Sequence, residues 1–365
     1  MYTLGNNLTI TIFGASHDAQ MGVTINGLGH GLKLDLEQLD KDLLARRPKR
    51  PSETARVEAD EYEIVSGYYN GYTTGTPLTF IVKNKDVNSK SYDHLRDVYR
   101  PSHADYPADV HYEGYNDPRG GGMFSGRLTV LFVIAGSLAK SLLEQCNVKI
   151  ITRIKQVKDQ IDSSFSNNFD EDVRRIKNRD LAVLSDDFEQ FVKKEIHQVK
   201  LMNNSLGAIL ESKVVGVKVG LGEPYFNKLD SKLAQYIMSI GAIKGVSFGD
   251  GFDFVHHLGS QVLDEYEVVD HKIQLLANHN GGIVGGLSTG APIIINTIVK
   301  PTPSINLDVK TVSKSKHENI IHQTKGRHDS SIFTRIPIVL DCMIALAILD
   351  LYCKDNALDA LRGEK

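Results

Sequence analysis

Two histidine-containing segments are the parts of this sequence best suited to acid–base chemistry. One runs from Gly14 to His17, and the other runs from Arg100 to Tyr106 around His103. A histidine has an unperturbed pKa near neutrality, so a small environmental shift makes it a proton donor or acceptor at working pH. A lone loop histidine is more often a surface or satisfied core residue, but two such segments together predict a site that moves protons. Neither segment is expected in the core.

A basic segment, Arg46-Arg47-Pro48-Lys49-Arg50, places four cations in five residues. Guanidinium groups bind phosphate and carboxylate through two parallel hydrogen bonds. Arginines at a helix C-terminus can instead complement the helix dipole, which explains one or two of these charges. Four cations favour a role in binding an anionic ligand.

Two glycine-rich segments, 119–127 and 278–290, could bring backbone close to a ligand. Glycine lets backbone N–H groups turn toward an anion, and the first segment leads into an expected helix start. A flexible surface loop explains the first segment as well, and turns between strands explain the second.

A further candidate combines Lys300-Pro301-Thr302-Pro303-Ser304-Ile305 with Lys325-Gly326-Arg327-His328-Asp329. In the second part a carboxylate is flanked by histidine and cations, a neighbourhood that shifts pKa values in either direction. A surface ion cluster is the alternative.

The composition limits the class of protein. The chain has 365 residues, and 41% hydrophobic with 24% charged residues is typical of a soluble globular protein. The net charge of −3 provides no general attraction for nucleic acid, so anion binding must be local. The three cysteines, Cys146, Cys342 and Cys353, lack metal-ligand spacing and indicate inert thiols in a reducing compartment, with no metal site.

No segment resembles a targeting or membrane signal. The start of the chain alternates like a strand and has no basic, apolar leader pattern. The most apolar run, Ile336 to Tyr352, is short and contains Asp341 and Asp350, which predicts a buried C-terminal helix. We therefore expect a cytoplasmic protein without a membrane partner.

The expected elements mix strands and helices without regular alternation, which favours an α+β fold over a doubly wound α/β fold. Strands are predicted at Leu8–Phe13, Leu78–Val82, Val214–Val219 and Ile293–Val299, and helices after Asp35, from Arg127 to Gln145, from Ser185 to Lys200 and from Leu229 to Ile240. The polar region 153–200 is expected at the periphery. Neither G-x-G-x-x-G nor G-x-x-x-x-G-K-[ST] occurs, so the common dinucleotide and P-loop signatures are missing.

Taken together and in this order, these segments resemble the chorismate synthase family over nearly the whole chain. Further matching segments are Ser66-Gly67, Thr73–Pro77, Gly220–Pro224 and Lys244–Phe252. The resemblance implies an α+β, β-α-β sandwich forming a single large domain over residues 1–365, and a homotetramer as the usual assembly.

The resemblance also implies an activity. The expected enzyme is a monofunctional carbon–oxygen lyase acting on phosphates, at the last step of the shikimate pathway. It would remove phosphate from 5-enolpyruvylshikimate-3-phosphate by anti-1,4 elimination to give chorismate. Reduced FMN would be required without net redox change. The sequence shows no NAD(P)H:flavin reductase segment, so an external reductase would supply the reduced flavin.

Roles follow by motif from the same resemblance. His17 would protonate or hydrogen-bond the departing phosphate, His103 would manage the proton on the reduced flavin, and Asp329 would relay the abstracted proton near flavin N5. The residues expected to hold substrate anions are Arg46, Arg47, Arg127 and Arg327. Those expected at the flavin are Ser125, Gly126, Gly286, Lys300, Ser304 and Arg327.

The chain departs from the family pattern at several positions, among them Asp18, Lys49, Met123, Phe124 and Leu128. Asp18 and Lys49 stand where the family usually has glycine, and we expect them to face each other as a compensating pair. Two other functions remain open: a flavin-dependent redox enzyme acting on another anion, and a family member that binds anions without catalysis.

Overall fold

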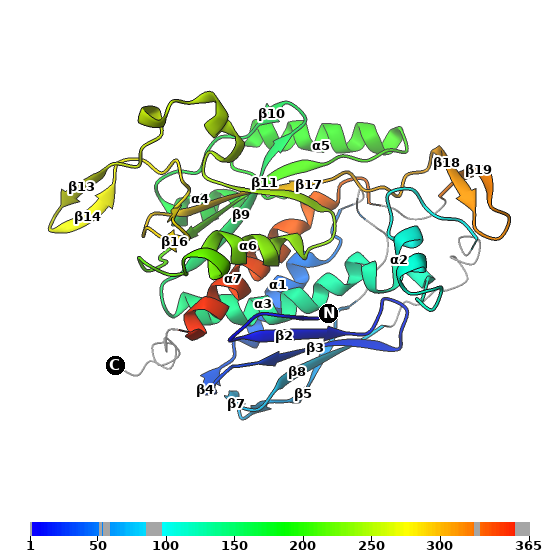
Figure 1. Cartoon of the computed structure of the whole chain (residues 1–365), viewed down its shortest axis with the longest axis horizontal. Helices are drawn as coiled ribbons and strands as arrows, with labels where there is room; N and C mark the ends of the chain where they lie inside the picture. Colours follow the sequence, from blue (N-terminus) through cyan, green and yellow to red (C-terminus); the bar gives the residue numbers. More distant parts are fainter. Residues whose placement is uncertain (1, 51–52, 54–58, 85–96, 325–328, 355–365) are drawn as a thin grey trace.

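The computed structural model describes residues 2–50, 53, 59–84, 97–324 and 329–354, and it shows two antiparallel sheets with helices between them (Figure 1). The first sheet has the order β1-β2-β3-β8-β5, with β1 Thr3–Leu4, β2 Thr9–Phe13, β3 Gln20–Asn26, β8 Leu78–Lys83 and β5 Tyr62–Ser66. The second has the order β10-β9-β11-β17-β12, with β10 Gln160–Ile161, β9 Lys149–Val157, β11 Ala208–Val215, β17 Ile293–Val299 and β12 Ile243–Phe248. This confirms the predicted α+β, β-α-β sandwich.

The middle layer consists of α1 (Leu36–Arg46), α3 (Thr129–Glu144), α6 (Leu229–Met238) and α7 (Ile336–Lys354). Helices α3 and α7 cross closely at Gly136, where an added Cβ would lie 2.3 Å from the Cβ of Cys342. The segments Gly126–Glu144 and Ile336–Cys353 are long and apolar enough to cross a membrane, but 78% and 83% of their apolar windows are buried inside the protein. Their apolar surface is thus used by the two sheets that enclose them.

The remaining elements lie outside the two main sheets and the middle layer, and most of them are short (Figure 1). They are the strands β4 His30–Lys33, β6 Tyr68–Tyr69 and β7 Tyr72–Thr74; the hairpins β13 Tyr266–Val269 with β14 Lys272–Leu275, β15 Ile283–Val284 with β16 Leu287–Ser288, and β18 Asp308–Ser313 with β19 Glu318–Gln323; and the helices α2 Asp105–His111, α4 Phe169–Lys177 and α5 Asp186–Leu201. Short 3₁₀ turns cover Arg119–Phe124, Gly126–Leu128, Tyr225–Asn227, Gly251–His256, Gly259–Gln261 and Ile332–Thr334.

Most predicted elements are confirmed within one or two residues. The Asp35 carboxylate accepts a hydrogen bond from the Gln38 backbone N–H at 2.9 Å, so the predicted helix start is correct. The strand predicted at Val214–Val219 instead runs from Ala208 to Val215. It ends at Gly216, which has a φ of +83° and lies so close to Asn147 that an added Cβ would be 2.0 Å from its carbonyl oxygen.

The polar region 153–200 is less peripheral than expected. Arg153 and Ile154 belong to β9, which lies inside the second sheet, and both are buried. The Arg153 guanidinium binds Glu211 at 2.7 Å and lies over the ring of Phe165 at 4.9 Å. Pairing allows charged residues to be buried, which the polarity of the sequence alone does not reveal.

A buried ionisable cluster joins the middle layer to the second sheet. The Thr152 hydroxyl donates to the Asp341 carboxylate at 2.6 Å and lies 2.7 Å from the Ser212 hydroxyl. Lys140 lies 2.6 Å from Asp42. Burial raises the pKa of Asp341 to about 6, although the charge of Lys140 acts in the opposite direction.

We predict that Asp341→Asn changes the pH dependence of stability. A carboxyl whose pKa is about 6 when folded and roughly 3.9 when unfolded stabilises the fold most below pH 4. That contribution, about 3 kcal/mol, is lost as the pH rises toward 6. Relative to wild type, the variant should therefore gain about this much unfolding free energy between pH 4 and pH 7 in urea titrations. Asp187→Asn, at an exposed helix start, is the control, and curves of wild type and Asp341→Asn that stay parallel would contradict the prediction.

Candidate active site

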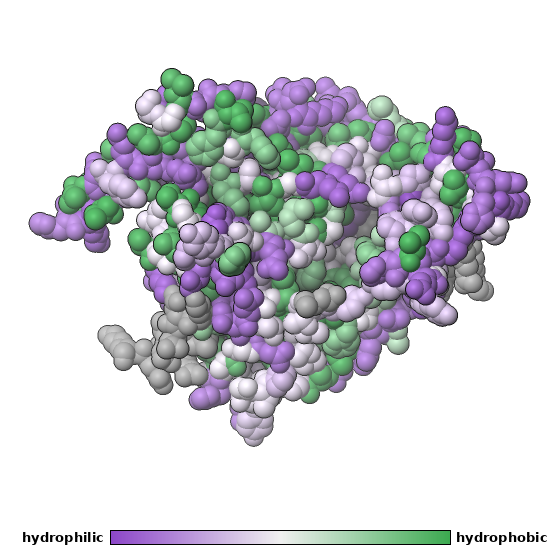
Figure 2. All heavy atoms as spheres, in the orientation of Figure 1, coloured by the Kyte–Doolittle hydropathy of each residue, from purple (hydrophilic) through white to green (hydrophobic). Residues whose placement is uncertain are grey.

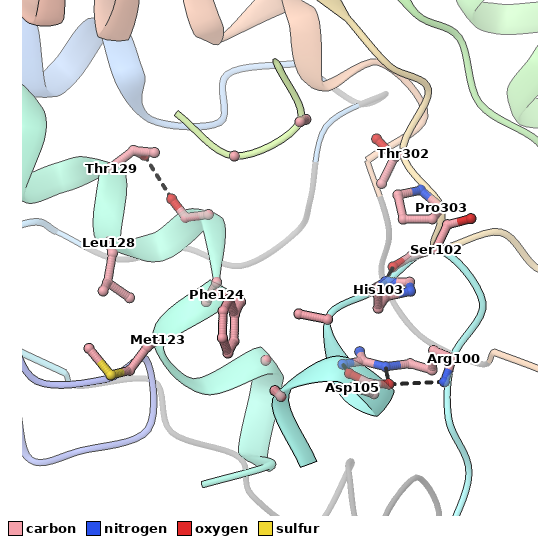
Figure 3. A pocket seen from close by; sticks show the side chains of 18 of the residues that line it. Arg100, Ser102, His103, Asp105, Met123, Phe124, Leu128, Thr129, Thr302 and Pro303 are labelled. Carbon is pink, nitrogen blue, oxygen red and sulfur yellow. Dashed lines mark hydrogen bonds and ion pairs between the residues drawn. The ribbon is translucent and has the colours of Figure 1, made fainter. Parts of the chain in front are cut away.

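A cavity of about 720 Å³ lies beside the middle layer, a size typical of small-molecule sites (Figure 3). Its walls come from residues 98–109, 114–129, 239–244 and 300–304, and from the start of α7. Figure 3 shows His103, Ser102 and Pro303 on one side, with Phe124 and Met123 on the other. Segments far apart in the sequence therefore form one site.

His103 is held in this wall as a neutral imidazole. Its Nδ1 lies 3.1 Å from the Pro101 carbonyl oxygen, which can only accept, so Nδ1 carries the proton. Its Nε2 then accepts from the Ser304 hydroxyl at 2.8 Å. Burial, followed by the charge of Arg100, lowers the pKa of His103 to about 4. At neutral pH, Nε2 therefore carries no proton, and the side chain can accept a proton there but cannot donate one from it.

Cations outnumber carboxylates among the described residues that line the cavity. The cations are Arg46, Arg100, Lys244, Lys300, Lys314 and Arg335, and the carboxylates are Asp105, Asp109 and Asp117. Burial and the nearby charge of Lys244 lower the pKa of Lys300, whose Nζ donates to the Ser102 carbonyl at 2.9 Å. Such an excess of positive charge attracts an anionic ligand.

Three of the predicted substrate-binding arginines meet at one buried carboxylate, Asp60. Arg46 Nη1 lies 2.9 Å from Asp60, Arg47 Nε lies 3.8 Å from it, and Arg127 also pairs with it. Arg46 donates further to Thr129 at 3.1 Å and is the only one of the three on the cavity wall. Asp60 thus brings the three arginines together, but Arg47 and Arg127 do not line the cavity.

His17 is 5% exposed, so the expectation that neither histidine segment is buried was wrong for this one. Its Nδ1 lies 3.0 Å from the Ser16 hydroxyl. Gly120 packs on the ring with a φ of +59°, and an added Cβ would lie 1.9 Å from the His17 Cε1. The glycine-rich turn therefore closes over His17, which is not among the residues lining the cavity.

The expected pair of Asp18 and Lys49 does not form. The Asp18 carboxylate accepts from the Ala15 N–H at 2.8 Å, closing its own turn, and lies 3.9 Å from Arg119. Lys49 is exposed, and its backbone N–H donates to Glu53 at 2.6 Å. Each of the two residues forms hydrogen bonds within its own turn and not with the other residue.

The other predicted site residues divide into two groups. Ser125, Gly126, Lys300 and Ser304 line the cavity as expected. Asp329 is not among the residues that line the cavity, but it pairs with Arg335, which is. Gly286 lies in the β15–β16 turn, where an added Cβ would be 2.7 Å from the Glu223 carbonyl oxygen, and it does not line the cavity. Arg327 lies outside the described residues.

Sequence reasoning assigned no role to several residues that shape the site. Arg100, in a motif that was recognised, pairs through both Nε and Nη2 with Asp105 at 2.7 Å. Lys244 also stood in a recognised motif. Arg335 lies outside the recognised motifs, and its only signal was a cation at the start of a strongly apolar helix.

Comparisons with known proteins identify the family of this chain. A family model described as Chorismate synthase matches residues 8–353. Among curated relatives, the chorismate synthase of Methanococcoides burtonii is 40% identical over 95% of this chain and 94% of its own, and that of Pyrococcus abyssi is 40% identical over 95% and 96%. A crystal structure of chorismate synthase, 23% identical, superposes with a TM-score of 0.74 over 96% of this chain and 93% of its own, which supports the fold. The chain therefore belongs to the chorismate synthase family and is an enzyme of this type, a lyase.

Proposed function

We propose that this enzyme converts 5-enolpyruvylshikimate-3-phosphate into chorismate by anti-1,4 elimination of phosphate, with reduced FMN bound and no net redox change. The observation that carries the proposal is a neutral His103 in the wall of a cavity whose described lining has more cations than carboxylates. A proton acceptor beside an anion site is what loss of phosphate and a ring hydrogen requires.

The described lining fits both ligands. The substrate carries a phosphate and two carboxylates, and FMN carries another phosphate, which suits lysines and arginines. An apolar wall suitable for a flavin ring comes from Phe124, Phe132, Ile332, Ile336 and Val339. Reduced FMN, when bound, would donate electron density to the substrate only transiently, so the reaction would consume no reductant.

The protein groups would hold and move the protons. His103 Nε2 is the proton acceptor at the cavity wall, and Ser304 orients it. His17, packed against the 119–124 turn, is proposed as the donor to the departing phosphate. The resemblance implies a proton relay for Asp329, and its pairing with Arg335 allows a positioning role instead. Ser125, Gly126, Lys300 and Ser304, which line the cavity, are proposed at the flavin together with Arg327. Arg46, also in the lining, is proposed at the substrate anions together with Arg327.

An anaerobic assay tests the function. The purified protein, substrate and photoreduced FMN should yield chorismate and phosphate in equal amounts, while the flavin spectrum stays that of the reduced form. Turnover without flavin would contradict the proposal. Flavin oxidised in proportion to product would instead favour a redox enzyme on this scaffold, and binding without product would favour an anion-binding protein.

We further propose a homotetramer in the cytoplasm, with reduced FMN supplied by an external NAD(P)H-dependent reductase. The β13–β14 hairpin extends from the body (Figure 1), and Figure 2 shows hydrophobic side chains among hydrophilic ones on this arm. Tyr266, Val268 and Ile273 are exposed there. A two-stranded hairpin is marginally stable alone, and exposed apolar patches mark interfaces. Light scattering on the purified protein gives its mass directly.

A further inference from the structure

Arg335 is a cation of the cavity wall whose backbone is firmly held. It follows the Ile332–Thr334 turn, and Ile332 and Ile336 line the cavity beside it. The Thr334 hydroxyl donates to Glu53 at 2.7 Å. The buried Glu53 carboxylate also accepts from the Lys49 N–H at 2.6 Å. These contacts fix where the guanidinium enters the cavity.

The three described arginines of the lining differ in how many of their N–H groups are already engaged. Arg46 donates through Nε, Nη1 and Nη2. Arg100 uses Nε and Nη2 together on Asp105. Arg335 contacts Asp329 through Nη2, while its Nε is buried without a hydrogen-bond partner in the described part of the chain.

An unsatisfied guanidinium N–H at a cavity wall points to a ligand. Burying a donor without a partner costs about 1–3 kcal/mol, and more when the group is charged. The Arg335 side chain is 18% exposed, so the cavity still has access to it. A phosphate or carboxylate oxygen in the cavity would pair with the accessible part of this guanidinium and compensate for the N–H that stays unsatisfied.

We propose that Arg335 binds an anionic group of the ligand in this cavity, and that Asp329 is a positioning residue that acts through Arg335. The proposal deepens the proposed function and rests on it for the identity of the ligand. Asp329 holds one side of the guanidinium, which restricts its rotation and leaves its exposed part at the cavity wall. The anion is either a charged group of the substrate or the phosphate of FMN.

Binding measurements on the full chain test this role. Oxidised FMN is titrated by its fluorescence, and 5-enolpyruvylshikimate-3-phosphate by calorimetry. Arg335→Gln should weaken one of the two ligands about 10- to 100-fold, the scale of a lost charge-assisted hydrogen bond, and the ligand affected identifies the anion. Arg335→Lys should recover part of the affinity, because it keeps the charge without the planar fork. Arg174→Gln, an equal charge change at an exposed site on α4, should bind as wild type does.

The Asp329→Asn variant distinguishes a role in positioning Arg335 from a role in proton transfer. If Asp329 acts through Arg335, this variant weakens the same ligand and raises the corresponding KM, with kcat within a few-fold of wild type. A large fall in kcat at unchanged affinity would overturn the positioning role and support a proton relay.

Folded Arg335→Gln that binds both ligands as tightly as wild type would overturn the anion-binding role. If Arg335→Gln does not fold, Arg335→Lys with wild-type affinity for both ligands overturns it equally. Wild-type protein that binds either ligand through Arg335 but forms no chorismate would refute the proposed function and leave this inference standing.

Discussion

His103→Ala is expected to lower the rate of chorismate formation by about 10²–10⁴-fold, the scale of a positioned acid or base. The imidazole lies in the cavity wall with Nδ1 committed to the Pro101 carbonyl and Nε2 directed to Ser304. Alanine removes the proton acceptor. The anaerobic assay with reduced FMN measures the effect, and His197→Ala, an exposed histidine on α5, is the matched control.

The pH profile gives the same prediction a second readout. Because the pKa of His103 is lowered to about 4, its neutral form persists down to that pH and is lost below it. An acid limb in kcat/KM, which reports the free enzyme, is therefore expected near pH 4. Bound anions favour the protonated imidazole, so the limb in kcat should lie at higher pH. Near-normal turnover of His103→Ala would show that another group accepts the proton.

Asp350→Ala should lower the free energy of unfolding by about 3–5 kcal/mol, the range for breaking a buried ion pair. The fully buried Asp350 carboxylate, on α7, accepts backbone hydrogen bonds from Asn6, Asn7 and Leu8 at 2.7–3.1 Å. It also accepts from the buried Lys232 ammonium at 3.0 Å. Alanine would leave one buried cation and three backbone N–H groups without this partner.

Urea unfolding of three variants tests the role of Asp350. Asp187→Ala, at an exposed helix start, should change stability by less than about 1 kcal/mol. Adding Lys232→Met to Asp350→Ala should recover part of the loss, because the uncompensated charge is removed. A loss below about 1 kcal/mol in Asp350→Ala would mean that water replaces the carboxylate at no great cost.

The sequence predicted which residues belong to the site better than it predicted the contacts between them. Histidine and serine motifs identified His103 and Ser304 separately, and the structure brings them into one hydrogen bond across 201 positions. Nothing local to either segment shows that pairing. The lowered pKa of His103 depends on burial first, so it could not be predicted from neighbours in the chain.

The arginines show most clearly that charge partners cannot be predicted from the sequence. The cluster at 46–50 was predicted to bind ligand as a group, but Arg50 pairs with Glu53 at 2.6 Å and also with Asp180. Asp60 carried no motif, yet it gathers three arginines. Charge partners are set by tertiary contacts, so a run of cations in sequence does not show which of them remain available.

The position of α7 determines when this protein can finish folding. The helix lies between the two sheets and packs against β9, yet β9 ends at Val157 and α7 begins only at Ile336. During synthesis, 178 residues, from 158 to 335, must therefore be added between this strand and the helix that covers it. At 5–20 residues per second these take roughly 9–36 s, and the apolar face of β9 waits for α7 during that time. A nascent chain of this protein is therefore expected to depend on chaperones until α7 leaves the ribosome.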